Sequence, residues 1–402
     1  MINADISAQG DLLAISFATR PSQGSEGGVG WTFVRAAGQL AESTGTHVDL
    51  ICDGRDEIEL RAAMEFESWS NSMTVHPVAL PSAALAKFGN ARTRLSYLAW
   101  MPKARLLANR LVANSRYRAS HQFTFATASM PSCLPTKAAM RVWGPLAIPD
   151  ISTSSELSKC NFRDRIGVKA GQYGSRTFIS SVSRLICQND NTLLVARTRG
   201  VPATLEPNVV AEPRVRAVST DQILTLAGSL IERKRPWLAL QMINDAKMKD
   251  FRLQIVGDGP LRPEMERYCR LERISSRVEF TGHISHADAV ERISISAALV
   301  HFAVREGAGW VVGEAAAGGV PSVVLGATGA ATVLRLSGDL GVNVAECDSA
   351  APPLDQVREA VLHTVERDNW LPSSRWSAKR LPELVGQWTS SPEPRSGFDE
   401  RA

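Results

Sequence analysis

The sequence predicts an α/β protein made of two doubly wound domains that face each other across a cleft. Its 402 residues are enough for two domains of ordinary size. Short apolar runs alternate with helical stretches in both halves, which is typical of parallel sheets covered by helices. Around Pro207 and Pro213 this alternation lapses, which indicates a linker. We therefore expect an N-terminal domain over residues 1–212, a C-terminal domain over 213–385 and a polar tail over 386–402.

The first half opens on an apolar strand over residues 12–18. A glycine-rich turn is expected over residues 24–30, and a helix then places Trp31, Val34, Ala37 and Leu40 on one apolar face. Further strands are predicted over residues 47–52, 74–80, 122–126, 141–143 and 184–187.

The second half repeats the alternation with more regularity. Strands are predicted over residues 223–227, 253–256, 277–280, 299–304 and 322–325, and helices over 237–245, 261–271, 287–296 and 311–317. In such sheets ligands bind beyond the carboxyl ends of the strands. We therefore expect a binding site in the cleft between the two domains.

Composition and local patterns exclude several classes of protein. The first residues lack the basic and apolar regions of a signal peptide, and no apolar run approaches the roughly 18 residues of a membrane span, so a cytoplasmic location is expected. The six cysteines are scattered, which indicates reduced core thiols. The net charge of +4 is small, and no nucleic-acid partner is expected. No Gly-x-Gly-x-x-Gly directly follows a strand with an acidic partner downstream, which argues against a dinucleotide-dependent oxidoreductase.

Residues 85–120 form a basic segment with eight Lys and Arg and no Asp or Glu. Leucines and Trp100 are interleaved with these charges, so one face of a helix can meet a membrane surface. The alternative is a solvated basic face above a buried apolar one. Pro102 is expected to interrupt the helix.

The stretch from His301 to Pro321 predicts a buried strand, a glycine-rich turn and the start of a helix. The glycines of that turn let backbone approach a ligand closely, and the free N–H groups of the opening helix favour an anion. Glu306 and Glu314, separated by seven residues, suit sugar hydroxyls instead. The alternative is an ordinary solvated loop carboxylate and a helix N-terminal carboxylate.

The pattern Glu-x7-Glu followed by Ala-x-Ala-x-Gly-x-Pro resembles the donor-site motif of retaining glycosyltransferases of family 4, the group-1 type. In that family two facing Rossmann-like domains form the GT-B fold. The first Glu contacts the transferred sugar, the second holds the nucleotide ribose, and the backbone between them binds the diphosphate. The resemblance assigns the first two roles to Glu306 and Glu314. The diphosphate role falls to Ala308, Gly309, Trp310 and Val311.

The start of the second domain, from Ala227 to Pro236, resembles the family's Gly-Arg-Leu-x-x-x-Lys-Gly, whose Arg and Lys neutralise the donor diphosphate. Lys234 takes the Lys position, and Ser229 takes the Arg position. Cations are needed there because the leaving nucleoside diphosphate gains negative charge. Either Arg233 or Arg235 supplies the lost charge, or the site is weaker.

Two further blocks follow in the family's order. Ile255-Val-Gly-Asp-Gly-Pro260 resembles Val-Gly-x-Gly-Pro and places Gly257 and Gly259 in a tight turn at the donor. Val278-Glu-Phe-Thr-Gly282 resembles Val-x-Phe-x-Gly, whose backbone meets the nucleotide base, and places Thr281 there. Four blocks in order over residues 223–325 are far more specific than any one of them.

The first domain carries two similar features. The segment from Gly24 to Trp31 resembles Gly-Ser-Glu-x-Gly-Val-Gly-Trp, which implies that backbone N–H groups of Gly27 and Gly28 reach the sugar and phosphate. A plain strand-to-helix connection is the alternative. His121 is similar to the His in a family strand that ends facing the donor sugar, although a lone histidine there is as often structural. The family's glycines after Trp143-Gly-Pro145 and after the strand that follows Pro321 are replaced here, so acceptor loops and donor contacts are expected to differ.

The resemblance implies transfer, with retention, of a sugar from a nucleotide diphosphate-sugar to a hydroxyl of a glycan or lipid-linked acceptor, as in surface polysaccharide or glycoconjugate synthesis. Glu306, His121 and Lys234 are the expected catalytic residues. No metal or cofactor is expected, because Lys234 and helix amides would neutralise the charge and the sequence contains no Asp-x-Asp. A peripheral position at the inner face of the cell membrane follows if residues 85–120 bind lipid. The alternative function is a scaffold subunit that kept the fold and lost turnover, which Ser229 favours.

Overall fold

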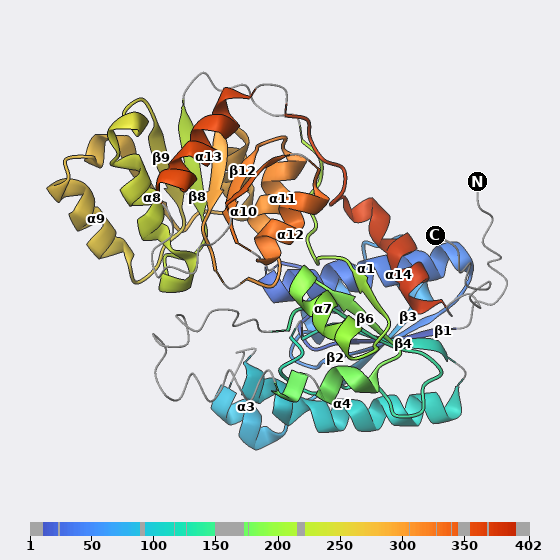
Figure 1. Ribbon diagram of the computed structural model, residues 1–402. Coiled ribbons are helices and arrows are strands. Elements are labelled where there is room, and N and C mark those ends of the chain that lie inside the picture. The colour runs from blue at the N-terminus through green and yellow to red at the C-terminus, as the bar shows by residue number, and fades with distance from the viewer. Residues whose placement is uncertain are drawn as a thin grey trace, which may run out of the picture.

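The computed structural model shows two parallel sheets, each covered by helices (Figure 1). It describes residues 11–22, 25–88, 93–115, 117–125, 127–148, 173–175, 177–214, 222–304, 306–326, 328–338, 340–344, 354–367 and 370–390. Gly24, Arg92, Arg116, residues 215–221 of the predicted linker and residues 391–402 of the predicted tail lie outside the described residues.

The first sheet has seven strands in the order β3-β2-β1-β4-β5-β6-β7, and all neighbouring strands are parallel. The strands are β1 (Asp11–Ser16), β2 (Val48–Asp53), β3 (Met73–Val78), β4 (Tyr117–Thr124), β5 (Arg141–Leu146), β6 (Arg184–Cys187) and β7 (Ala203–Leu205). One face packs against α1 (Ser25–Thr44) and α14 (Leu381–Thr389), and the other against α4 (Arg94–Asn114) and α7 (Asp190–Thr198). The shorter helices are α2 (Glu57–Met64) and α3 (Ser82–Phe88).

The second sheet has six parallel strands in the order β10-β9-β8-β11-β12-β13. The strands are β8 (Ile223–Ala227), β9 (Arg252–Val256), β10 (Val278–Gly282), β11 (Ala298–His301), β12 (Ser322–Leu325) and β13 (Gly341–Val344). The helices are α8 (Pro236–Ile243), α9 (Arg262–Leu271), α10 (His286–Ser294), α11 (Trp310–Ala317), α12 (Gly329–Leu336) and α13 (Leu354–Glu366). The predicted doubly wound α/β fold is therefore confirmed.

Both sheets reverse their strand order beside the first strand of the domain, between β1 and β4 and between β8 and β11. The helices that follow such neighbouring strands leave in opposite directions, and a crevice opens between them at the carboxyl ends. The loops after β1 and β8 and the loop after β11 therefore line the region where the two domains meet.

The glycine-rich run 24–30 is not the turn that the sequence predicts, because α1 already begins at Ser25. Glycine is needed inside this helix for packing. A Cβ atom on Gly30 would lie 1.8 Å from the carbonyl oxygen of Ala18, directly after β1. The run therefore brings the first turns of α1 against the end of the first strand.

Helix α4 also differs from the prediction, because it continues through Pro102. It begins with a capping box in which Thr93 and Ser96 satisfy each other's backbone N–H groups. Proline leaves the carbonyl of Leu98 without its usual helical donor, and both residues are exposed, so water can solvate that carbonyl. Tyr97, Trp100 and Ala104 are buried on the opposite side. None of the helices in the described part of the chain is long and apolar enough to span a bilayer.

The chain crosses between the domains twice. It first leaves β7 and enters the second domain, and after α13 it returns so that α14 packs against α1 (Figure 1). Leu381, Val385 and Trp388 of α14 lie in the same core cluster as α1 and β4. Helix α14 thus belongs to the first domain by its packing, although the sequence boundary at residue 385 runs through it.

Candidate active site

A cavity of about 1050 Å³ lies between the two domains. On the first-domain side it is lined by the loop after β1 and the first turns of α1, including Pro21, Ser22 and Trp31. On the other side it is lined by the loops after β8, β9 and β11 and by α10 and α11. The cavity is therefore at the position that the topology of the two sheets dictates.

The cavity brings most of the predicted donor residues together. Its lining includes Gly28, Ser229, Arg233, Lys234, Gly257, Glu306, Ala308, Trp310, Val311 and Glu314. The other predicted site residues, His121, Gly27, Gly259, Thr281 and Gly309, are not among the lining residues.

Glu306 lies between two cation-forming side chains. Its Oε1 accepts a hydrogen bond from Lys234 Nζ, and its Oε2 meets Nε2 of His301, the last residue of β11. Burial alone would raise the pKa of Glu306, but His301 and Lys234 outweigh it and lower that pKa to about 2. The site therefore holds an ionised carboxylate at neutral pH, 14% exposed, facing the cavity.

Lys234 is placed by a short, stiff connection between β8 and α8. It ends a 3-10 turn that begins at Glu232, and Arg235 then adopts a left-handed conformation with φ of 48° before Pro236 opens α8. The carbonyl of Arg233 accepts a hydrogen bond of 3.1 Å from the N–H of Val304, which joins this turn to the loop after β11. Lys234 and Glu306 are thus positioned together by backbone as well as by charge.

The turn after β9 requires glycine for a close backbone approach. Gly257 has a φ of 132°, and a Cβ atom there would lie 2.2 Å from the carbonyl oxygen of Gly228. A Cβ atom on Gly259 would lie 2.5 Å from the carbonyl oxygen of Leu230. Gly259 therefore supports the loop after β8 and not the cavity itself. Thr281 also acts locally, since its hydroxyl donates to the carbonyls of Ile255 and Gly282.

Helix α11 opens toward the cavity. Gly309 caps it, and a Cβ atom on Gly309 would lie 2.6 Å from the Cα atom of Ala330 on α12. The glycine thus allows α12 to approach and does not touch a ligand. Backbone N–H groups in the first turn of α11 have no helical acceptor, and Ala308, Trp310 and Val311 present this end of the helix to the cavity.

Glu314 lies one turn further along α11 and faces the same cavity. Its Oε1 is 2.6 Å from Nε2 of His286, the first residue of α10. This hydrogen bond raises the pKa of His286 against the opposing effect of burial. The carboxylate is only 12% exposed, whereas the His286 side chain is 71% exposed, so the histidine can move aside for a ligand.

His121 does not reach the cavity. It is fully buried within β4, its Nε2–H donates 2.8 Å to the carbonyl of Gly144, and its ring packs against Phe123 and Trp388. Burial lowers its pKa to about 3, so the ring is neutral. His121 is a core residue, and the predicted contact with a sugar does not fit this position. Gly27 is also buried, and its carbonyl accepts from the N–H of Arg20.

Several residues near the cavity were not singled out from the sequence. His301, His286 and His283 are isolated in the sequence, and only the structure brings them toward Glu306 and Glu314. Asn208 lines the cavity from the first crossing and accepts a hydrogen bond of 3.2 Å from the indole N–H of Trp310. No local spacing reports such contacts between segments far apart in the chain.

Solved structures with this arrangement of two sheets are glycosyltransferases. WaaG, a glycosyltransferase involved in lipopolysaccharide biosynthesis, is 15% identical with a TM-score of 0.54, and the match covers 94% of each chain. Sucrose-phosphate synthase from Thermosynechococcus elongatus is 14% identical with a TM-score of 0.60, over 94% of this chain and 98% of that one. TarM from S. aureus is 10% identical with a TM-score of 0.60, over 95% of this chain and all of that one, 100%. The chain has the GT-B fold.

The second GT-B domain also matches a sequence model. Residues 221–359 match the model of the glycosyl transferases group 1. The matched segment contains Lys234, Gly257, Glu306 and Glu314, the residues that line the second-domain side of the cavity. A comparison with curated proteins gave no match.

The GT-B cavity offers three chemically different regions. Lys234 and the opening of α11 favour an anion, while Glu314 offers a carboxylate to hydroxyl groups. Glu306 places a negative charge between them, close to the first domain. This arrangement suits a ligand that carries phosphate in its middle and hydroxyl groups on both sides.

Proposed function

We propose that the protein is a glycosyltransferase that moves a sugar from a nucleotide diphosphate-sugar to a hydroxyl acceptor, with retention at the anomeric carbon and without a metal. The observation that carries the proposal is the Glu306 and Lys234 pair, placed beside the opening of α11 in the interdomain cavity. The match of residues 221–359 to the group 1 model supports it.

In this proposal Lys234 and the first N–H groups of α11 bind the donor diphosphate, and Glu314 binds the ribose hydroxyls. Lys234 exchanges its contact with Glu306 for the phosphate oxygens, which leaves Glu306 to stabilise positive charge on the sugar. The bond from the anomeric carbon to phosphate breaks, and a bond to the acceptor oxygen forms. The acceptor proton moves to the departing phosphate oxygen, so no protein nucleophile is needed.

The donor site is tested by nucleotide binding. We expect uridine diphosphate or another nucleoside diphosphate to raise the melting temperature, because a ligand that binds only the folded state stabilises it. Lys234→Ala should weaken that binding about tenfold to a hundredfold, the usual effect of losing a charge-assisted contact. Calorimetric titration measures it, with Lys249→Ala, an exposed lysine of the same domain, as the matched control. Equal affinity of Lys234→Ala and wild type would remove the proposed diphosphate contact.

A second candidate function is a scaffold subunit that binds a nucleotide sugar without turnover. Ser229 favours it, because this residue lines the cavity at a position where a cation would otherwise assist the leaving group. Donor hydrolysis or transfer by the purified chain, followed by NMR of the product, separates the two functions. Transfer with an inverted anomeric carbon would contradict the retaining mechanism, and nucleotide binding without any turnover would support the scaffold.

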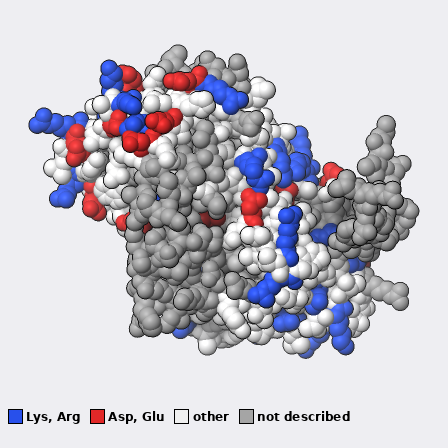
Figure 2. Space-filling model, in the orientation of Figure 1, with Lys and Arg blue, Asp and Glu red and all other residues white. Residues whose placement is uncertain are grey.

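We also propose that α4 brings the first domain to a membrane surface where a glycan or lipid-linked acceptor is presented, as at the inner face of a cell membrane. Leu95, Leu98 and Leu106 are exposed by 57%, 38% and 52% at helical spacing, and exposed Lys103 and Arg110 lie beside them. Figure 2 shows Lys and Arg without Asp or Glu along the lower edge of the molecule, where α4 lies in Figure 1. An apolar stripe beside basic residues is typical of helices that lie in a bilayer interface.

Membrane binding is tested by co-sedimentation with anionic vesicles at low salt. We expect Leu106→Glu to reduce the bound fraction severalfold, because a charge replaces apolar surface in the interface. Leu271→Glu is the control, since Leu271 is 68% exposed on α9 of the second domain. Absence of binding by the wild-type protein at low salt would end the membrane proposal.

A further inference from the structure

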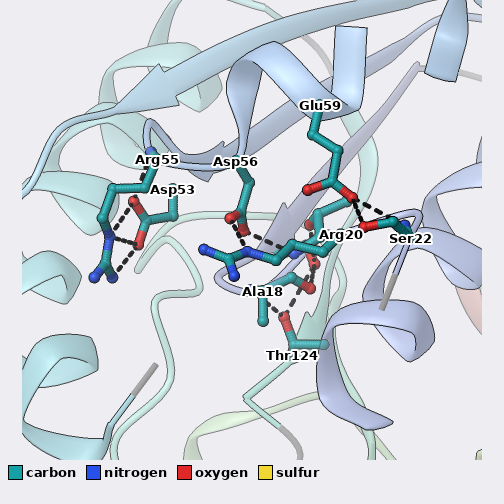
Figure 3. Close-up of polar contacts among 10 residues, drawn as sticks. Ala18, Arg20, Ser22, Asp53, Arg55, Asp56, Glu59 and Thr124 are labelled. Atoms are coloured by element: carbon teal, nitrogen blue, oxygen red, sulfur yellow. Dashed lines mark hydrogen bonds and ion pairs between the residues drawn. The ribbon is translucent and has the colours of Figure 1, made fainter. Parts of the chain in front are cut away.

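A polar cluster lies at the carboxyl edge of the first sheet, outside the residues assigned to the donor (Figure 3). It joins the loop after β1 to the start of α2. The carboxylate of Asp56 is fully buried, and its two oxygens accept from the backbone N–H of Thr19 at 3.0 Å and from Nε of Arg20 at 2.8 Å. The backbone of this loop and the arginine side chain are therefore held by the same carboxylate.

Arg20 uses only part of its hydrogen-bonding capacity in this contact. Its side chain is 16% exposed, and only Nε has a partner within the described part of the chain. In Figure 3 the two terminal nitrogens point away from the Asp56 carboxylate. A guanidinium held through Nε presents its terminal N–H groups in a fixed orientation, with little conformational entropy left to lose on binding.

The surroundings make this position rigid. Arg55 lies at the same edge of the sheet, pairs with the buried Asp53 at 2.5 Å, and stands 5.8 Å above the ring of Phe17. Phe17 packs in turn against Tyr97 and Trp100 of α4. The loop that carries Arg20 is thus anchored on an aromatic floor that continues into α4.

Arg20 adjoins the donor cavity in the chain. The next two residues, Pro21 and Ser22, line that cavity, and Glu59 of α2 holds Ser22 through its N–H at 2.9 Å and its hydroxyl at 2.6 Å. An acceptor that enters from the first domain must pass this loop. Arg20 is therefore placed to contact a part of the acceptor outside the reacting hydroxyl.

We propose that Arg20, oriented by Asp56, binds an anionic group of the acceptor, a phosphate or carboxylate, while the acceptor hydroxyl enters the donor cavity. This inference rests on the proposed function, since it names the acceptor class of the same site. The chemistry favours an anion over a neutral sugar, because planar terminal N–H groups match two oxygens of a phosphate or carboxylate. Burial of the Arg20 and Asp56 pair costs desolvation, which contacts of the remaining N–H groups with an anion offset.

The test uses the full chain saturated with uridine diphosphate, which blocks the diphosphate region of the donor site. Glycerol 3-phosphate and glycerol are then titrated as probes. We expect wild type to bind glycerol 3-phosphate about tenfold more tightly than glycerol, and Arg20→Gln to lose about tenfold in that affinity. Arg61→Gln is the matched control, because Arg61 is 51% exposed on α2 and pairs with Glu57 one turn away. It should bind as wild type does.

Two further measurements keep the outcome clear. Arg20→Lys retains a charge beside Asp56 but not the planar donor pair, so it should keep the wild-type melting temperature and still bind the phosphate more weakly. Phosphatidylcholine vesicles with and without phosphatidic acid separate a lipid headgroup from a soluble phosphate ester, since only the former gives vesicle binding that depends on Arg20. Arg20-dependent binding in either arm supports the proposal.

Equal binding of both probes by wild type, or unchanged binding by folded Arg20→Gln in both arms, would overturn the proposal. The donor site is judged separately, because Arg20→Gln should keep its affinity for uridine diphosphate within about twofold. If wild type binds no nucleoside diphosphate, the proposed function fails. The anion titrations without nucleotide then still decide whether Arg20 binds phosphate.

Discussion

At the scale of single residues, the charge of Glu306 depends on its two neighbours. An isolated buried carboxylate would take up a proton, but Lys234 and His301 hold it ionised. A transferase with this site needs no separate base to keep that charge, because the two cation-forming groups supply it before any ligand arrives. Lys234 can leave for a phosphate while His301 stays, since His301 is only 2% exposed and ends β11.

The lowered pKa of Glu306 predicts an acid-dependent loss of stability. Its folded pKa lies below the ordinary value of 4.5, so its contribution is present above pH 4.5 and is lost as pH falls toward 2. Glu306→Gln should cost on the order of 3 kcal/mol near pH 7, and this cost should shrink below pH 4.5.

Urea unfolding at several pH values measures the difference between wild type and Glu306→Gln. Glu264→Gln serves as the control, because Glu264 is exposed on α9. A difference that stays constant from pH 7 to pH 3 would contradict the assignment of the ion pair.

The sequence predicts the site residues that belong to local patterns and misses those that meet only in three dimensions. Glu306, Lys234 and Glu314 follow strands at fixed spacing, and parallel strands bring their carboxyl ends to one edge. His301 shows no such signal, because its role depends on the loop that folds Glu306 back over the end of β11. His121 was wrong as a contact for sugar, because a strand position alone does not say which side chains the covering helix buries.

At the scale of elements, α1 rests on the end of β1 through glycine. Gly30 has no room for a Cβ atom, whereas Gly386 in α14 would place one 3.4 Å from a flexible Leu40 side chain. The two helical glycines therefore have different physical roles. One permits close packing, and the other only lowers the helix propensity of its segment.

Alanine substitutions separate these roles. Gly30→Ala should destabilise the protein by about 3 kcal/mol, because strand or helix must shift to relieve the overlap. Gly386→Ala should be neutral or stabilise by about 0.5 to 1 kcal/mol, since the unfolded chain loses freedom and the folded helix does not. Equilibrium unfolding in urea compares the two variants, and equal effects would refute the packing argument.

The sequence predicts elements best where a strand is buried on both faces. The second-domain strands β8 and β12 begin and end at the predicted residues, because each is a continuous apolar run bounded by turn residues. The edge strands β7 and β13 were missed, since they have only 3 and 4 residues and carry a weaker apolar pattern. The start of α1 and its continuity through glycine depend on packing against β1, which composition does not report.

At the scale of the whole molecule, the two crossings between domains are joined side by side. Arg375 in the second crossing makes two hydrogen bonds, of 2.7 and 2.6 Å, with Glu206 in the first. The N–H of Ala211 donates 2.9 Å to the carbonyl of Trp376. On the cleft side, Asp190 of α7 pairs with Arg335 of α12 at 2.6 Å. The arrangement of the domains is thus held at the hinge and at one edge of the cavity.

Trp388 tests how far the first domain depends on α14. It is 2% exposed and packs against Phe33 and His121, so Trp388→Ala should cost about 3 to 5 kcal/mol. Hydrogen exchange should accelerate in α1 and β4 and not in α8. Trp237→Ala, in the second domain, should show the reverse pattern. Uniform acceleration in both domains by either variant would contradict the assignment of α14 to the first domain.

The sequence could not place α14, because an amphipathic helix specifies a buried face but not the surface that buries it. That placement has a consequence for synthesis. A ribosome makes residues 11–205 first and then all of the second sheet, and α14 leaves the exit tunnel only afterwards. Until then, the surface of α1 and β4 that α14 covers is open to solvent. The middle of the chain can therefore complete its folding before the beginning does, and chaperones that bind nascent chains would meet this open surface.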